Sequence, residues 1–165
     1  MKVDVSDIIS VNGASTKLDF QEAPPEREPV KGYTLGEDLS FAGTLTNVDG
    51  ILHLDGRLKV AYDGVCYRCL GPVKGMLDLK INENFITGDD AEQNDMYKYK
   101  GYVLDISKAL GDNIILNLPM KLLCSADCKG LCDKCGKNLN EGRCGCTEES
   151  IDLRLEGLVK YFEKH

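Results

Sequence analysis

The sequence predicts an α+β protein, built from a twisted antiparallel sheet or a partly closed β-barrel with two helices and a cysteine-rich knuckle. Three observations predict this fold. Apolar and polar residues alternate in short stretches between Ser40 and Ile86, apolar residues recur at helical spacing in two later segments, and eight cysteines lie in closely spaced groups. The length of 165 residues allows one core with a small appendage.

The N-terminal region is expected to form a β-hairpin. Two alternating stretches within residues 1–20 flank Asn12-Gly13, which is a strong two-residue turn signal. Residues 21–30 follow with three prolines and three glutamates, and the stretch 89–95 is strongly acidic. Both segments are therefore expected to be exposed loops.

An antiparallel meander is expected between Ser40 and Ile86. The dipeptides Asp49-Gly50 and Asp55-Gly56 are read as turns that divide this region into four or five short strands. Residues 97–103 are expected to add one more strand pair or an extended segment.

Two helices are expected after the sheet. Residues 106–117 carry apolar side chains at helical spacing, with Asp105 as a candidate N-cap and Pro119 as a stop. A second apolar stripe in residues 147–165 predicts a helix that docks on the core. The expected domains are a β-rich core with one helix over residues 1–120, a cysteine-rich knuckle over 121–146 and the C-terminal helix over 147–165.

Composition restricts the classes of function. No apolar run is long enough to span a bilayer, and the polar N-terminus lacks the features of a signal peptide, so we expect a cytoplasmic protein with no membrane partner. The net charge of −7 argues against a protein that coats nucleic acid with its whole surface. The stretch from Lys121 to Cys146 differs, because it holds five basic and three acidic residues.

Metal binding is the expected use of the cysteines, because cytosolic reductants oppose a framework of disulfides. Zinc prefers four thiolate or imidazole ligands, and a Cys-x-x-Cys turn supplies two of them. The strongest candidate site, with a glycine-rich and asparagine-rich loop between its two halves, comprises Cys132, Cys135, Cys144 and Cys146.

A second candidate site brings together residues that are more than fifty positions apart. Its expected ligands are Cys66, Cys69, Cys124 and Cys128, so that one or two zinc ions are predicted. The spacing also allows Cys128 to compete for a place in the other site. A rival reading makes Cys66 and Cys69 a redox dithiol with a thiol pKa lowered by Arg68, although a redox motif of that kind should open a helix.

No enzyme motif is visible, and no catalytic residue or small-molecule substrate is predicted. The sequence lacks nucleotide-binding glycine loops, a P-loop, a serine elbow and a His-Glu-x-x-His motif. His53 lies in a predicted strand and His165 is the last residue, so neither is a good candidate for a ligand or for acid and base catalysis.

Taken together, three motifs resemble the YceD family, the bacterial and plastid large ribosomal RNA subunit accumulation proteins. They occur in order as Cys66-Tyr67-Arg68-Cys69-Leu70, Asp105-Ile106 with Ile114 to Pro119, and Gly130 to Asn140. The resemblance implies a role in 23S ribosomal RNA accumulation or processing and in large-subunit assembly, through RNA or a pre-ribosomal particle and without known catalysis. One departure is Asp152-Leu153-Arg154-Leu155, where family members commonly have Asp-Pro-Arg-Leu, which puts the start of the last helix in doubt.

Two classes of partner follow from these observations. The first is RNA, met by exposed basic and stacking side chains, namely Lys129, Lys134, Lys137, Arg143, Tyr67 and Arg68. The structural alternative is that the lysines only solubilise the knuckle and that Tyr67 shields a metal site. The second class is a basic ribosomal protein, which an acidic adaptor would hold through its sheet edge or acidic loop.

Overall fold

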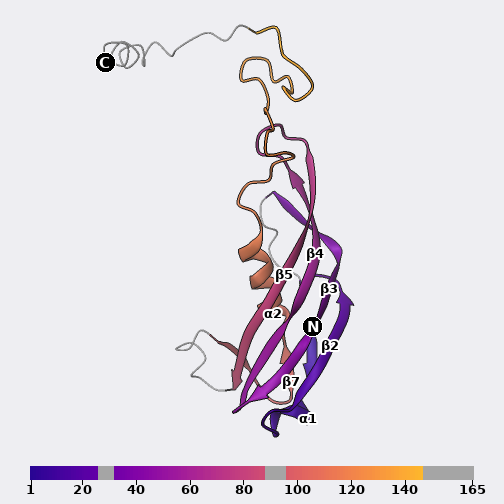
Figure 1. Ribbon diagram of the computed structural model, residues 1–165, viewed down its shortest axis with the longest axis vertical. Helices are drawn as coiled ribbons and strands as arrows, with labels where there is room; N and C mark the ends of the chain where they lie inside the picture. The colour runs from indigo at the N-terminus through magenta and orange to yellow at the C-terminus, as the bar shows by residue number, and fades with distance from the viewer. Residues whose placement is uncertain (26–31, 88–95, 147–165) are drawn as a thin grey trace, which may run out of the picture.

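The computed structural model describes residues 1–25, 32–87 and 96–146, and a long twisted sheet dominates it (Figure 1). In order across this sheet, the strands are β2 (Ser15–Glu22), β3 (Tyr33–Val48), β4 (Ile51–Val65), β5 (Pro72–Thr87) and β6 (Tyr97–Tyr99). A separate two-stranded sheet comprises β1 (Lys2–Asp4) and β7 (Val103–Asp105). The helices are α1 (Ser6–Ile9) and α2 (Ser107–Asn117).

The α+β fold with a twisted sheet is confirmed, and the sheet is open. Strands β2 to β5 pair in antiparallel fashion, whereas β6 pairs with β5 in parallel. The sheet is therefore mixed, antiparallel as predicted from β2 to β5 and parallel at the β6 edge. Residues 97–103, predicted as a strand pair or an extended segment, contribute β6 and the start of β7, which pair with β5 and β1 in different sheets.

The predicted N-terminal hairpin is wrong. Strand β1 pairs with β7, so that Val3 lies opposite Leu104, and the short helix α1 separates β1 from β2. The carboxylate of Asp4 accepts a hydrogen bond from the Ser6 N–H at 2.9 Å, which turns the chain into α1. Asn12-Gly13 does form a turn, with Gly13 at φ +80°, but this turn leads from α1 into β2.

The meander has three long strands, because only one of the two predicted Asp-Gly turns exists and the turn that carries Cys66 and Cys69 joins β4 to β5. Asp49 and Gly50 have φ values of +51° and +87° and join β3 to β4, as the sequence predicts. Asp55-Gly56 lies inside β4, where Gly56 pairs with Gly43 of β3. A Cβ atom at Gly56 would lie 2.5 Å from Cζ of Phe41, so these glycines make room for a buried ring.

The core lies between one face of the sheet and helix α2 (Figure 1). The Ser107 N–H donates to the carboxylate of Asp105 at 2.9 Å, although Ile106 occupies the N-cap position itself. The helix ends at Asn117 because Leu118 is extended before Pro119. The largest fully buried side chains are Phe41, Phe85, Leu39, Leu45, Leu52, Leu54, Leu58, Ile81, Leu104, Ile106, Leu110 and Ile114.

Three predicted segments fall wholly or partly outside the described residues. They are the proline-rich loop beyond residue 25, the acidic loop 89–95 and the C-terminal helix 147–165. The second helix of the described residues is α1, which the sequence did not predict. Within the described ranges, no helix combines the length and the apolar character needed to cross a membrane.

Replacing Gly43 by alanine should destabilise the sheet by about 1–3 kcal/mol, because the added Cβ would overpack the core. That atom would lie 2.5 Å from the carbonyl oxygen of Asp55 and 2.8 Å from the Phe41 ring. Urea unfolding of the metal-loaded protein measures the change. Ser40→Ala, at an exposed position of the same strand, is the control, and equal stability of the two variants would contradict this account.

Candidate metal centres

The turn between β4 and β5 brings Cys66 and Cys69 to one end of the sheet. The N–H of Cys66 donates to the carbonyl of Gly71 at 2.8 Å, and the N–H of Leu70 donates to the carbonyl of Cys66 at 2.9 Å. These two bonds close a tight knuckle around the first sulfur. The flanks are both strands, so a redox motif that opens a helix is not formed here.

The turn that carries Cys132 and Cys135 has the same hydrogen-bond pattern. Its first cysteine donates to the carbonyl of Lys137 at 2.9 Å, and the N–H of Gly136 donates back to Cys132 at 2.8 Å. The residue after the second cysteine has positive φ in both turns, +71° at Gly136 and +56° at Leu70. The two Cys-x-x-Cys turns are therefore one local structure made from two unrelated stretches of chain.

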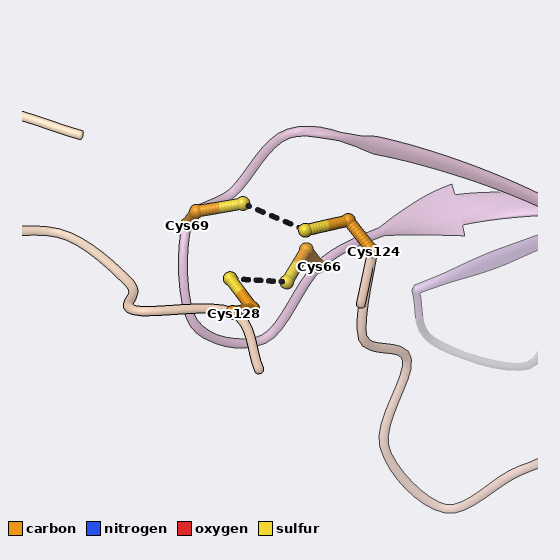
Figure 2. Close-up of side chains that lie close together, drawn as sticks. All are labelled: Cys66, Cys69, Cys124 and Cys128. Atoms are coloured by element: carbon orange, nitrogen blue, oxygen red, sulfur yellow. Dashed lines mark hydrogen bonds between the residues drawn. The ribbon is translucent and has the colours of Figure 1, made fainter. Parts of the chain in front are cut away.

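The first cluster, called the inner site, consists of Cys66, Cys69, Cys124 and Cys128. Their sulfur atoms all lie within 4.8 Å of one another and point toward a common centre (Figure 2). The Cys66 and Cys128 sulfurs are 3.8 Å apart, and the Cys69 and Cys124 sulfurs are 3.6 Å apart. A tetrahedral zinc ion with Zn–S bonds of about 2.3 Å requires sulfur separations of about 3.8 Å, so the spacing fits zinc.

The second cluster, called the outer site, consists of Cys132, Cys135, Cys144 and Cys146. Their sulfurs also lie within 4.8 Å of one another, and all four come from one stretch of fifteen residues. Three of the inner cysteines are buried, whereas the outer ones are half-buried or exposed. The eight thiols are free, and the structure separates them into the two quartets that the spacing predicts.

Backbone and side-chain hydrogen bonds fasten the knuckle to the sheet. The N–H of Tyr67 donates to the carbonyl of Leu122 at 2.8 Å, and the N–H of Leu131 donates to the carbonyl of Arg68 at 3.1 Å. Nη1 of Arg68 donates to the carbonyl of Cys128 at 2.9 Å and to that of Ala126 at 3.3 Å. Arg68 thus braces the segment that carries the last two inner cysteines.

Asn140 connects the outer loop to the inner site. Its Nδ2 atom lies 3.3 Å from the sulfur of Cys128, and its Oδ1 atom accepts from the N–H of Lys129 at 2.8 Å. The neighbouring Leu139 N–H donates to the carbonyl of Gly130 at 2.9 Å. An amide donor of this kind stabilises a metal-bound thiolate and fixes its orientation.

The hydrogen bonds lower the pKa of some thiols in each site and raise the pKa of others. Amide N–H groups of the turn, chiefly that of Cys69, lower the pKa of Cys66 to about 6, and the N–H of Cys135 leads the groups that lower the pKa of Cys132 to about 6. The side chain of Asn140 is the main cause of the lowered pKa of Cys128. Neighbouring sulfurs, Cys128 foremost for Cys124 and Cys135 foremost for Cys146, raise the pKa of each to about 12.

The candidate RNA contacts fall into two groups. Lys129 is exposed directly after the inner-site Cys128, and Lys134, Lys137 and Arg143 are exposed in the loop of the outer site, where Nζ of Lys137 donates to the carbonyl of Arg143 at 3.2 Å. Tyr67 and Arg68 lie in the β4–β5 turn beside the inner site. The sequence did not predict the contact of Asn140 with the inner site, because that contact joins residues that are not neighbours in the chain.

A comparison with models of known protein families shows the family to which this chain belongs. A family model described as "Large ribosomal RNA subunit accumulation protein YceD" matches residues 54–161, which include all eight cysteines. The chain belongs to the YceD family. The residues that carried the resemblance in the sequence therefore identified the family correctly.

YceD relatives occur in bacteria and plants. An uncharacterized protein of Mycobacterium tuberculosis is 32% identical over 117 residues, covering 68% of this chain and 56% of the relative. The chloroplastic YCED homolog 1 of Arabidopsis thaliana, a large ribosomal RNA subunit accumulation protein, is 43% identical over 49 residues, 30% of this chain and 15% of that protein. The match thus spans little more than half of the mycobacterial relative. No solved structure matches this chain.

Zinc loading should weaken as pH falls, because protons compete with the metal for each thiolate. Cys66 and Cys132 are thiolates above about pH 6 and gain protons below it, so the affinity should fall more steeply below about pH 6 than above it. Competition with a chelator between pH 5 and pH 8, roughly the range around these pKa values, measures this change. An affinity that does not depend on pH, or fewer than two zinc ions per chain in native mass spectrometry, would contradict the assignment.

Asn140→Asp should lower zinc affinity at the inner site by about ten- to a hundredfold, because a carboxylate replaces the amide donor beside the Cys128 thiolate. Cobalt substitution reports the change through its sulfur-to-metal charge-transfer band, and release of the ion to a chelator gives the rate. The isosteric control is Asn117→Asp, since Nδ2 of Asn117 donates to the carbonyl of Asn113 in α2. Equal release rates in both variants would remove Asn140 from the metal centre.

Proposed function

We propose that this protein is a non-catalytic, cytoplasmic factor for 23S ribosomal RNA accumulation and large-subunit assembly that binds RNA or a pre-ribosomal particle through its zinc knuckle. Membership of the YceD family supports the first part of the proposal. The observation that carries the second part is the pair of four-cysteine clusters, which lie in and beside an exposed basic segment at the end of the sheet.

The ligand sets support a structural role for the metal. Each quartet supplies four thiolates, which fill the tetrahedral shell of zinc and leave no position for water or substrate. Such sites contribute folding energy, because metal binding is coupled to the ordering of the segment around it. The proposed zinc ions therefore shape a contact surface and carry out no chemistry.

The charges of the sheet favour the knuckle as the RNA contact. On the outer face, Arg57 and Lys59 pair with Asp78, Lys74 with Asp63, and Lys80 with Asp55, at N–O distances from 2.9 to 3.9 Å. These cations are partly neutralised by their partners. Within the described residues, the exposed Lys129, Lys137 and Arg143 of the knuckle form no ion pair, which favours them over the sheet cations as contacts for phosphate groups.

An acidic adaptor that binds a basic ribosomal protein is the second candidate. Residues 26–31, 88–95 and 147–165 together contain 11 of the 27 acidic residues and 5 of the 20 basic ones. The described residues are nearly neutral by comparison, with 16 acidic and 15 basic side chains. Attraction of a basic protein would therefore act mainly through residues 88–95 and 147–165, which hold nine acidic and three basic side chains, because residues 26–31 hold two of each.

Crosslinking in cells followed by sequencing of the bound RNA should enrich large-subunit ribosomal RNA, and the protein should sediment with precursor particles. The double variant Lys129→Glu and Lys134→Glu should lower RNA affinity by about tenfold or more at low salt, because it reverses two charges beside the phosphates.

Lys17→Glu, at an exposed position of β2 on the main sheet, is a charge-reversal control outside the knuckle. Zinc content is measured in every variant, so that loss of the knuckle is not mistaken for loss of a contact. Absence of RNA enrichment together with capture of a basic ribosomal protein would establish the adaptor instead. Absence of comigration with precursor particles would overturn the role in assembly.

A further inference from the structure

The tip of the β4–β5 turn exposes three large apolar side chains close together in the chain. Tyr67 is 62% exposed, Leu70 is 64% exposed and Val65 is 49% exposed, all within six consecutive residues. Two cysteines of the inner site lie between these side chains and turn inward (Figure 2). The turn therefore buries its sulfurs and presents its apolar side chains to the outside.

Leu70 occupies a backbone conformation that leucine disfavours. Its φ of +56° lies in the left-handed region, and the equivalent position of the other Cys-x-x-Cys turn is Gly136, at +71°. Packing does not explain the leucine, because most of its side chain is exposed. Strained residues of this kind concentrate at functional sites, where another molecule uses the side chain.

The bonds around the tip hold it in place without covering it. The Tyr67 N–H donates to the carbonyl of Leu122, next to Lys121, and the Arg68 guanidinium donates to the carbonyl of Cys128, next to Lys129. An exposed basic residue thus adjoins each bracing residue in the chain, Lys121 before Leu122 and Lys129 after Cys128. The tip thus combines an aromatic and an aliphatic side chain with cations in the turn itself and in the two segments that brace it.

We propose that Tyr67 and Leu70 form a platform for unpaired RNA bases, with Lys121, Arg68 and Lys129 facing the adjacent phosphates. Unpaired bases stack on aromatic side chains, whereas the bases of a duplex keep their faces hidden in the helix. The border of positive charge distinguishes this surface from a purely apolar contact for a protein. The inference rests on the proposed function and specifies the RNA that the knuckle takes as single-stranded.

Binding of the full-length, zinc-loaded protein to a fluorescent single-stranded RNA oligonucleotide of mixed sequence tests the platform, with a hairpin duplex of related sequence as the second probe. Tyr67→Ala should weaken single-strand binding by about five- to a hundredfold, as expected for the loss of one stacked base. Leu70→Gly and Leu70→Ala should each weaken it by about three- to tenfold. Duplex binding should be weak for all of these proteins.

The two Leu70 variants separate the side chain from the strain. Leu70→Gly removes both and should raise the thermal midpoint by about 2–4 °C, whereas Leu70→Ala keeps the strained backbone and should not. A variant that becomes more stable and binds RNA less well shows that the leucine serves a ligand. Zinc content should remain unchanged in both variants.

Val48→Ala is the control, because Val48 is an exposed apolar residue at the β3–β4 turn, at the opposite end of the antiparallel strands. If the unaltered protein binds RNA and the Leu70 and Tyr67 variants bind it equally well, the platform is wrong while the proposed function stands. If the unaltered protein binds no RNA, the platform is wrong, and so is the proposal that the knuckle binds RNA. If the Tyr67 and Leu70 variants lose a protein partner but keep RNA binding, the platform is also wrong.

Discussion

The convergence of four sulfurs at the inner site is the constraint on which the knuckle depends. Residues 121–146, all of them described, contain no helix and no strand beyond the single bridge between Leu131 and Asn138. The buried cluster beside them consists of three cysteines, with a few half-buried apolar neighbours. So little burial cannot offset the entropy of ordering this segment, and metal binding is the interaction that can.

The order of the two sites along the structure follows from this dependence. The inner site joins a turn of the sheet to the chain after α2, so it closes a loop of more than fifty residues. The outer site is local and connects to the inner one through Leu131, Asn140 and their hydrogen bonds. Any surface formed by the outer basic residues is therefore positioned only when the inner site is intact.

Structure that depends on neighbouring residues was predictable from the sequence, whereas structure that depends on contacts between distant residues was predictable only in outline. The turn at Asp49-Gly50 and helix α2 follow from nearest neighbours, and both are confirmed. Asp55-Gly56 carries the same local signal as Asp49-Gly50, yet it lies inside a strand because the Phe41 ring fills the space above its glycine. The pairing of β1 with β7 likewise depends on contacts a hundred residues apart.

The two groups of four cysteines likewise depend partly on local spacing and partly on contacts between distant residues. Spacing indicated two groups of four but left Cys128 free to join either, and the bonds from Arg68 and Asn140 are what place it with Cys66. No sequence rule assigns such roles to an arginine or an asparagine. The left-handed Leu70 had a weak signal, because aligning the two Cys-x-x-Cys turns sets it against Gly136, where glycine is the expected residue.

The charge of a loaded knuckle bears on how it could select RNA. Each zinc ion with four thiolates carries a formal charge of about −2. Two such centres outweigh the small basic excess of residues 121–146, which have five basic and three acidic side chains. Attraction to phosphate can then come only from cations placed at the surface, away from the sulfurs, and it stays modest.

A modest phosphate attraction suits an assembly factor that must not remain on every RNA it meets. Non-specific affinity arises from phosphate contacts, whereas stacking requires bases that are free of pairing. On the proposal made here, Tyr67 and Leu70 supply the discriminating part of the binding energy. Bases that become paired as the ribosomal RNA folds would no longer offer a face to this platform, and the factor would leave with the progress of assembly.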